Sequence, residues 1–258
     1  MKVALLQTAG TGSVSGNLDL LEAKAAEASA QGARLLIAPE MFLTGYNIGD
    51  RTEALAEAVD GPSADRAAEI AARFGLALLY GFPEAAGGAV YNAALFVERD
   101  GTRSVYRKTH LFGAGERTHF ARGPERPPLL DLDGLKVGLL ICYDVEFPEA
   151  VRALAEAGAD LVAVPTALMA PYDIVAETVV PTRAYESGIF VAYVNRVGSE
   201  SDLTYVGRSA LVGPDGIALC RADDRSEALM IAEIDRQAIA RLREINPYLA
   251  DLRRDLYS

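Results

Sequence analysis

The sequence contains few cysteines and histidines and no tryptophan. Because its two cysteines, Cys142 and Cys220, lie far apart, they do not make the disulfide framework of a small secreted domain. With His110 and His119 as the two histidines and no CxxC motif, a structural zinc site is not expected. Long hydrophobic runs are missing too, since no stretch approaches the ~18 consecutive apolar residues of a membrane span.

Basic residues are outnumbered by acidic ones. Lysine and arginine total 25 and aspartate and glutamate total 36, so the formal net charge is −11 at pH 7. This balance argues against nucleic acid or an anionic membrane as a partner and fits a soluble enzyme. The opening MKVALLQTAG holds an apolar run too short for a signal peptide, so we expect a cytosolic protein.

Strand-like and helix-like segments alternate along the whole chain. Half of the 258 residues are hydrophobic, which is enough to bury one large core, and no low-complexity linker divides the sequence. We therefore expect a single α/β domain over residues 1–258. Helices are predicted from Asn17, as N-cap, to Gln31, over 63–74, from Pro148 to a stop at Gly158, and over 173–188 with a kink at Pro181.

A weak internal repeat divides the chain. KVALLQ (2–7) resembles KVGLLI (136–141), and GARLLIAPE (32–40) resembles GADLVAVPT (158–166). Each copy reads as a strand, a helix, Gly-Ala and a second strand that ends near proline. The pattern predicts two similar halves packed together.

Cys142 stands where a core strand ends, in KVGLLICYDVEFPEA (136–150). Strand, turn and helix present a nucleophile at an exposed tip, as in other nucleophile elbows. A buried apolar cysteine is the alternative interpretation. Cys220 lies in an alternating strand and is expected to be structural.

Two charged residues and one threonine accompany such strand ends. Glu40 follows an apolar strand, where a buried carboxylate needs a cation or a functional reason, although a surface cap would also explain it. Lys108, in YRKTHLF, either extends to solvent or serves the site. Thr166 ends the strand equivalent to that of Glu40. In open α/β sheets ligands gather at the carboxyl ends of strands.

Three motifs together carry a family resemblance. PEMFLTGY around Glu40, YRKTHLF around Lys108 and ICYDVEFPE around Cys142 occur in the order and at the distances found in the nitrilase superfamily, the carbon–nitrogen hydrolases. PEMFLTGYNIG and KTHLFG are especially similar to 5-aminopentanamidases, the amidases of bacterial lysine breakdown. The resemblance implies a four-layer α-β-β-α sandwich with two pseudo-symmetric halves, assembled through a helical face into homodimers or larger homo-oligomers.

The resemblance also implies the chemistry. Glu40 would be the general base, Lys108 the oxyanion stabiliser and Cys142 the nucleophile, with Glu116 in GAGERTHF as a second glutamate. A nearby ammonium would lower the pKa of the thiol, and the backbone N–H of Tyr143 would face the oxyanion. The reaction needs neither a metal nor an organic cofactor.

Glu146 is the residue that indicates a substrate. Relatives that act on carboxylate-bearing substrates often have arginine at this position, four residues after the nucleophile. The reversed charge predicts a short linear primary amide with a distal amine, such as 5-aminopentanamide. Alternatively, Glu146 pairs with Lys108 or caps the helix that begins at Pro148. Three further residues are expected by position to line the pocket: Tyr46, Tyr143 and Thr166.

Other functions stay open at this point. A carbamoyl-amine hydrolase would share the same three catalytic residues and accept an amine tail. Nitrilases commonly carry Cys-Trp-Glu at the nucleophile, whereas this chain has Cys142-Tyr143-Asp144, which favours an amide over a nitrile. A non-catalytic binding or scaffold member is the alternative of another class, and the intact Glu40 and Lys108 beside Cys142 argue against it.

Overall fold

Two six-stranded sheets form the centre of the protein. The structure, a computed structural model, describes residues 1–256. The first sheet has the order β14 (Ala228–Glu233), β1 (Lys2–Gln7), β2 (Ala33–Ile37), β3 (Ala77–Ala86), β4 (Ala89–Val97), β5 (Arg103–Arg107). The second has the order β6 (Leu129–Leu132), β7 (Leu135–Leu139), β8 (Leu161–Pro165), β9 (Phe190–Val194), β12 (Ala210–Val212), β13 (Ala218–Arg221).

The two sheets repeat one pairing pattern. In each, three central strands are parallel, and antiparallel strands complete both sides. The repeated sequence segments form β1 and β2 in one half and β7 and β8 in the other. The predicted pseudo-symmetric halves are therefore confirmed. β14 comes from the far end of the chain and closes the first sheet beside β1.

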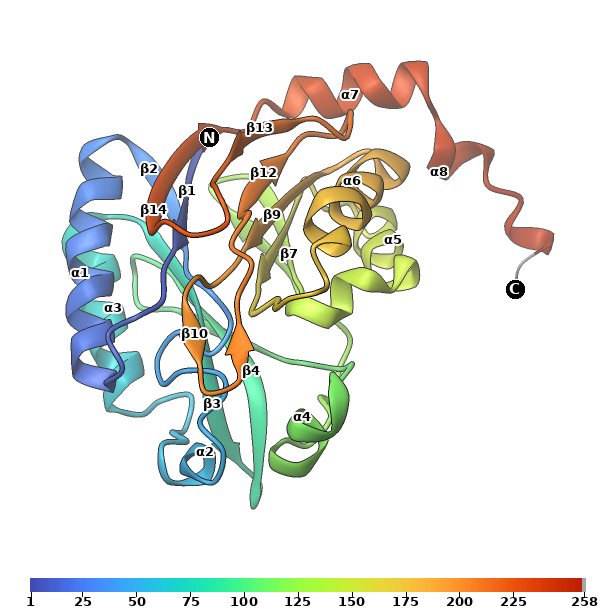
Figure 1. Ribbon diagram of the computed structural model, residues 1–258. Coiled ribbons are helices and arrows are strands. Elements are labelled where there is room, and N and C mark those ends of the chain that lie inside the picture. Colours follow the sequence, from blue (N-terminus) through green and yellow to red (C-terminus); the bar gives the residue numbers. More distant parts are fainter. Residues whose placement is uncertain (257–258) are drawn as a thin grey trace.

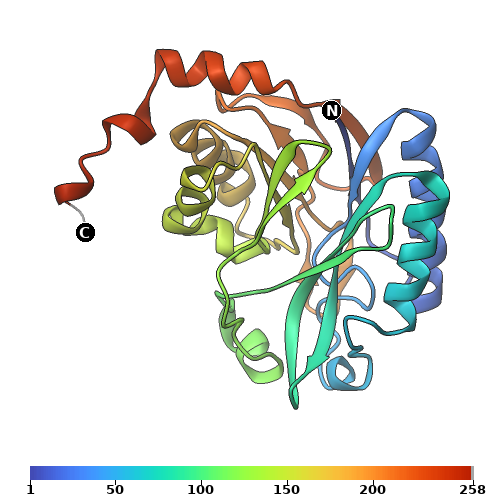
Figure 2. The same cartoon turned by 180° about the vertical axis from the view of Figure 1, so that it is seen from behind.

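Helices cover the outer face of each sheet, which gives the expected four-layer α-β-β-α sandwich (Figures 1 and 2). Helices α1 (Val14–Ala30) and α3 (Pro62–Phe74) pack on the first sheet, and α5 (Pro148–Glu156) and α6 (Val180–Ser187) pack on the second. Between the sheets, residues such as Val3 and Leu35 share one buried cluster with Val137. Strands buried on both faces explain the long apolar runs of the sequence.

Shorter elements connect and surround this sandwich. They are α2 (Arg51–Ala54), α4 (Gly113–His119), a 3₁₀ helix (Cys142–Glu146), a π-helical turn (Val175–Val179), the hairpin of β10 (Ser199–Glu200) and β11 (Leu203–Thr204), α7 (Arg236–Ile245), α8 (Tyr248–Asp251) and a last 3₁₀ turn (Arg254–Leu256). α7 lies along the top of the body with Ile239 in the core, and the chain from α8 onward projects away from it (Figure 1). Within residues 1–256, every helix is too short or too polar to span a bilayer.

The helix limits differ from the predicted ones at one point. The first helix begins at Val14 with Ser13 as N-cap, so the prediction of Asn17 as N-cap is wrong. Asn17 is buried instead, where its side chain accepts the backbone N–H of Thr11 at 2.7 Å and donates to the carbonyl of Leu43 at 3.0 Å. A buried amide that joins two loops resembles a cap in sequence, because both are polar residues at the edge of an apolar pattern.

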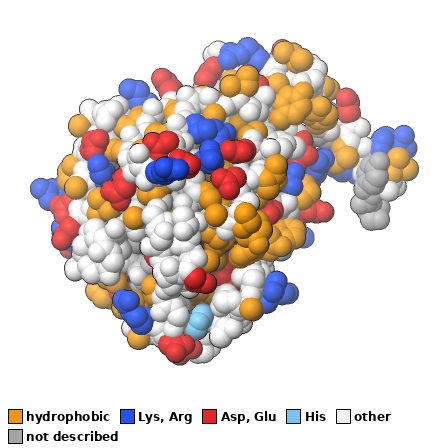
Figure 3. All heavy atoms as spheres, viewed as in Figure 1, with side chains coloured by type: hydrophobic (Ala, Val, Ile, Leu, Met, Phe, Trp, Pro, Cys, Tyr) orange, Lys and Arg blue, Asp and Glu red, His pale blue; other side chains and the backbone are white. Residues whose placement is uncertain are grey.

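The break predicted at Pro181 is confirmed. A π-helical turn over Val175–Val179 runs directly into α6, and Pro181 lies just after this irregularity, which interrupts the regular α-helical hydrogen bonding. The left-handed residue Gly32 ends the first helix as expected, with φ of 82°. Acidic and basic side chains are interspersed over the face seen in Figure 3, and hydrophobic ones gather to the right of its centre.

Candidate active site

The four residues that the sequence suggests for catalysis lie in different segments of the chain, outside the strands themselves. Glu40 follows β2, Lys108 follows β5, Cys142 begins the 3₁₀ helix after β7, and Glu116 lies in α4. The first three therefore stand where strands run out at their carboxyl ends. The two halves meet at this point, since the backbone N–H of Glu40 donates to the carbonyl of Thr166 at 3.3 Å.

Lys108 joins two carboxylates in a buried cluster. Its Nζ lies 2.7 Å from Oε1 of Glu40 and 2.6 Å from Oε1 of Glu116. The side chains of Lys108 and Glu40 are fully buried, and that of Glu116 is 3% exposed. Since charges are stable in a protein interior only when paired, these three residues form one electrostatic unit with a net charge of about −1.

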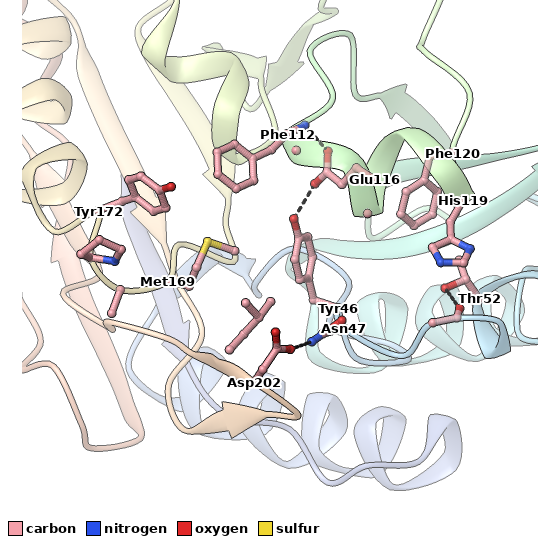
Figure 4. A pocket seen from close by; sticks show the side chains of 16 residues that line it. Tyr46, Asn47, Thr52, Phe112, Glu116, His119, Phe120, Met169, Tyr172 and Asp202 are labelled. Atoms are coloured by element: carbon pink, nitrogen blue, oxygen red, sulfur yellow. Dashed lines mark hydrogen bonds between the residues drawn. The ribbon is translucent and has the colours of Figure 1, made fainter.

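Neutral donors hold both carboxylates in place. Asn92 donates from Nδ2 to Oε1 of Glu40 at 2.7 Å. Tyr46 donates its hydroxyl to Oε1 of Glu116 at 2.8 Å, and the backbone N–H of Phe112 donates to Oε2 at 2.7 Å (Figure 4). Oε2 of Glu40 is buried and has no hydrogen-bond partner within residues 1–256. That atom is available to accept a proton.

Burial and mutual charge determine how the cluster titrates. Burial raises the pKa of Glu40, the Lys108 ammonium opposes that rise, and the second carboxylate adds to it. For Lys108, burial disfavours the charge, but Glu116 and Glu40 outweigh it and raise the pKa well above the ordinary value. Lys108 therefore stays charged, and Glu40 is a stronger base than a glutamate in water.

Cys142 occupies a strained position at the start of its turn. Its φ is +44°, in the left-handed region that residues with a side chain seldom adopt, as expected of a nucleophile elbow. Burial and the charge of Glu40 raise the pKa of the thiol well above its usual range, while Lys108 and the backbone N–H of Ala167 lower it. Lys108 thus lowers the pKa of the thiol as expected, but burial and Glu40 outweigh the ammonium, so the resting cysteine is a neutral thiol.

A glycine lets the backbone of the base approach the neighbouring strand. A Cβ built on Gly81 of β3 would lie 2.2 Å from the backbone nitrogen of Met41 and 2.7 Å from the Cα of Glu40. Any side chain at this position would push the Glu40 backbone away from the sheet. Gly81 therefore belongs to the structure that positions Glu40, although its own conformation is unstrained.

A pocket of about 460 Å³ leads to the cluster from outside. Glu116 and Tyr46 line it, together with apolar and aromatic side chains such as Phe112, Met169 and Tyr172 (Figure 4). Its outer part carries Asp202, which accepts a hydrogen bond from Asn47 at 3.0 Å. An apolar cavity with a few convergent polar groups suits a small organic molecule.

The residues predicted to bind substrate lie in different surroundings. Tyr46 lines the pocket and touches Glu116. Tyr143 is half-buried, with its ring edge-on to Phe112 at 5.3 Å between centroids. Thr166 is fully buried, and its hydroxyl donates to the carbonyl of Val164 at 3.0 Å, so its side chain already has a structural partner.

Glu146 is half-buried at the end of the nucleophile turn. Partial burial raises the pKa of its carboxyl, while Lys108 and Arg183 lower it. Lys108 makes its ion pairs with Glu40 and Glu116 instead, and the first turn of α5 has no side-chain cap. Within residues 1–256 the Glu146 carboxylate forms no salt bridge, so neither alternative considered for it is seen.

Sequence reasoning did not identify Asn92, the amide donor to Glu40. A signal was present, since asparagine interrupts the apolar strand YNAALFVE and is fully buried in the structure. Buried polar side chains need partners, so such a residue points to a polar site nearby. Among residues 1–256, no group of three or more His, Cys, Asp and Glu side chains is arranged to hold a metal ion.

A strained cysteine at a strand end beside a buried Glu–Lys–Glu cluster, within an α-β-β-α sandwich, defines the class of carbon–nitrogen hydrolases with a cysteine nucleophile. Residues 2–244 match the family model of the carbon–nitrogen hydrolases. The chain belongs to this family, the nitrilase superfamily.

Individual relatives agree with this assignment. A hydrolase encoded in the 5′ region of pqqF in Pseudomonas protegens is 49% identical, over 100% of this chain and 90% of that protein. An (R)-stereoselective amidase of Pseudomonas sp. is 36% identical, over 98% and 92%. Among solved structures, the amidase from Nesterenkonia sp. AN1 is 35% identical, with a TM-score of 0.85 over 100% of this chain and 98% of that chain. That structure is of a mutant in which acrylamide has added to the active-site cysteine by Michael addition.

Proposed function

We propose that this protein is an amidase that hydrolyses a short linear primary amide with a distal amine to the carboxylic acid and ammonia. The observation that carries the proposal is the buried cluster of Glu40, Lys108 and Glu116 beside Cys142. The similar Nesterenkonia protein is an amidase whose active-site cysteine adds to acrylamide, which supports the same role for Cys142.

The first half of the proposed reaction begins with a proton transfer. Oε2 of Glu40 takes the thiol proton, and the sulfur of Cys142 attacks the amide carbon, forming a tetrahedral intermediate. An ammonium has three donors, and Lys108 uses two for its carboxylates, so the third is left for the oxyanion. The backbone N–H of Tyr143 is the second oxyanion donor. Glu40 then returns the proton to the leaving nitrogen, and ammonia departs from a thioester.

The second half restores the enzyme. Glu40 accepts a proton from a water molecule, whose oxygen attacks the thioester carbon. When the tetrahedral intermediate collapses, the carbon–sulfur bond breaks, and the sulfur of Cys142 recovers a proton from Glu40. The product is a carboxylic acid. The cluster and Cys142 taken together keep their net charge through every proton transfer between Cys142 and Glu40, which limits the cost of performing the reaction in a buried site.

Glu146 supports the choice of an amine tail. Its carboxylate is half-buried, unpaired within residues 1–256, and close enough to the site for Lys108 to lower the pKa of its carboxyl. A substrate ammonium would supply the missing cation, whereas a substrate carboxylate would be repelled. N-carbamoyl amines share part of this chemistry, and the assay includes N-carbamoylputrescine to separate them from amides.

The experiment is ammonia release from 5-aminopentanamide, pentanamide, glutaramate and N-carbamoylputrescine in parallel, with Cys142→Ala as the inactive control. We expect 5-aminopentanamide to be preferred. In Glu146→Gln this preference over pentanamide should shrink, while Glu149→Gln, an exposed neighbour on α5, should leave it unchanged. Preference for glutaramate would contradict the role of Glu146, and turnover by Cys142→Ala would contradict the mechanism.

We also propose that residues 1–258 form a single domain that works in the cytosol as a homodimer or larger homo-oligomer. Exposed apolar side chains on and beside α6 support association through this helical face, among them Tyr185 of α6 and Tyr248 of α8, whose rings lie edge-on at 5.7 Å. Sedimentation velocity at micromolar concentration tests this, and a monomer would contradict it.

A further inference from the structure

Asp144 lies two residues after the proposed nucleophile and is fully buried. Its Oδ1 accepts the hydroxyl of Thr109 and the backbone N–H of His110, both at 3.0 Å, and lies 2.7 Å from Nδ1 of His110. Thr109 and His110 directly follow Lys108. One carboxylate oxygen therefore holds the segment that carries the ammonium of the site.

The other carboxylate oxygen holds two further segments. Oδ2 accepts the hydroxyl of Tyr106, in β5, at 2.9 Å, and the backbone N–H of Ile141, just before the nucleophile, at 3.2 Å. Tyr106 belongs to the first sheet, and Ile141 follows a strand of the second sheet. The Asp144 carboxylate thus joins the two halves of the molecule at the place where Lys108 and Cys142 meet.

Stability alone is a poor explanation for a charge at this position. A buried carboxylate loses its hydration, and hydrogen bonds to neutral donors offset that loss only when several are made at once. Within residues 1–256, His110 is the one side chain in ion-pair distance of Asp144, and it is a cation only when protonated. What this arrangement provides is geometry, because four hydrogen-bond donors and the Nδ1 of His110 converge on two oxygen atoms.

The contacts of Asp144 fix the backbone on both sides of the reacting groups, at the turn that carries Cys142 and at the segment that follows Lys108. The left-handed backbone conformation of Cys142 is strained. Cys142 lies in a tight turn between Ile141 and Asp144, and the backbone N–H of Asp144 donates to the Ile141 carbonyl across this turn at 3.0 Å. On the other side, the His110 ring stacks on Phe147 with centroids 3.9 Å apart, which fixes the segment after Lys108 against the end of the same turn.

We infer that Asp144 is a positioning residue that sets the placement of the Lys108 ammonium relative to the Cys142 sulfur. The inference rests on the roles proposed above for Lys108 and Cys142. Asp144 itself touches no reacting atom. It acts through the Lys108 segment on one side and the nucleophile turn on the other, so that the oxyanion donor and the nucleophile keep their alignment during turnover.

Asp144→Asn tests the inference, because the amide has nearly the same shape, but its nitrogen cannot accept the hydrogen bonds that one carboxylate oxygen accepts. We expect kcat to fall about 100-fold, the loss that a displacement near 1 Å produces, with KM changing far less. The pH profile of the rate at which iodoacetamide alkylates Cys142 should also shift to higher pH. The reason is that the Lys108 charge, which lowers the pKa of the thiol, is no longer held close to it. A role in stability alone would not move this profile.

Asp160→Asn is the matched control. Asp160 is another buried aspartate, whose Oδ2 accepts the backbone N–H of Lys136 at 2.9 Å, but it precedes β8 at the amino end of that strand, opposite to the carboxyl end where the thiol lies. We expect this variant to lose stability while keeping kcat and the alkylation profile. Equal losses of kcat in both variants, in proportion to their melting temperatures, would overturn the inference.

Two milder variants serve where Asp144→Asn does not fold. Tyr106→Phe and Thr109→Val each remove one donor and should give smaller shifts in the same direction. Wild-type kcat and an unchanged alkylation profile in both would overturn the inference. Failure of the wild-type protein to hydrolyse any amide would count against the proposed function alone, since alkylation of Cys142 reports on the alignment without turnover.

Discussion

Glu40→Gln separates the acid–base role of this residue from its structural role. Oε1 of Glu40 accepts Lys108 and Asn92, both at 2.7 Å, and the carbonyl oxygen of glutamine can accept the same two donors. The amide nitrogen then takes the place of Oε2, which has no hydrogen-bond partner within residues 1–256. The shape of the site is kept, and the base is lost.

Glu40→Gln should lower the turnover of the enzyme but make the Cys142 thiol easier to ionise. Loss of a general base lowers kcat about 10²- to 10⁴-fold, which corresponds to roughly 3–5 kcal/mol of barrier. Because the charge of Glu40 raises the pKa of Cys142, the variant should be alkylated by iodoacetamide at lower pH than the wild type. Stability should not fall, since one buried ammonium then faces one carboxylate in place of two.

The assay is ammonia release from 5-aminopentanamide, combined with mass spectrometry of Cys142 alkylation across pH and thermal melting. Glu84→Gln is the matched control, because Glu84 of β3 is a buried glutamate paired across β4 with Arg107 of β5, at 2.6 and 2.7 Å. A kcat for Glu40→Gln within about threefold of wild type would refute the assignment of Glu40 as the base, because general-base loss costs at least ~100-fold.

Three further predictions follow from the same cluster. The apparent pKa of the acidic limb in the pH profile of kcat/KM should lie above the usual pKa range of glutamate, because burial raises the pKa of Glu40 and activity is lost as pH falls through that pKa. An acidic limb at the ordinary pKa of glutamate would contradict this. Lys108→Met should abolish turnover and destabilise the protein by about 3–5 kcal/mol at pH 7, measured by urea unfolding, because two buried carboxylates lose their cation. Gly81→Ala should reduce kcat about 100-fold in steady-state assays, because its Cβ displaces the Glu40 backbone, and wild-type kcat would contradict the close approach.

The sequence was most informative where strands are buried on both faces. KVALLQ and KVGLLI became β1 and β7, because continuous apolar runs between turn signals have few alternatives in an α/β protein. Asp100-Gly101, a sequence typical of tight hairpin turns, likewise lies between the antiparallel strands β4 and β5. Local pattern and tertiary burial agree in these segments, which is why the repeat predicted the pseudo-symmetry.

Edge and surface elements escaped prediction. β6 and the β10–β11 hairpin are short and partly exposed, so their sequences carry neither a long apolar run nor a strict alternation. The first sheet also recruits β14 from the far end of the chain to pair with β1. Such a partner is set by how the whole chain packs, and a local pattern does not contain it.

For the site as well, the sequence predicted some features, whereas others depend on how the chain packs. Residue types and motif order brought Glu40, Lys108 and Cys142 to attention, but the state of the thiol depends on distances and burial that no spacing encodes. From the sequence, a lysine near the cysteine predicts only that the pKa of the thiol is lowered. The structure places two carboxylates on that lysine, and their charge together with burial favours the neutral thiol.

The charges around Lys108 also connect the mechanism to the substrate. Glu40, Glu116 and Lys108 carry a net charge of about −1 when all are ionised. Glu146 adds a further carboxylate nearby, whose pKa partial burial raises and Lys108 and Arg183 both lower. A substrate carboxylate would increase this excess, and a substrate ammonium would reduce it. A resting thiolate would increase it as well, which is a physical reason for Cys142 to stay protonated until Glu40 removes its proton during attack. The same negative excess thus explains why burial here favours a neutral thiol, and it supports the proposal of a cationic amide.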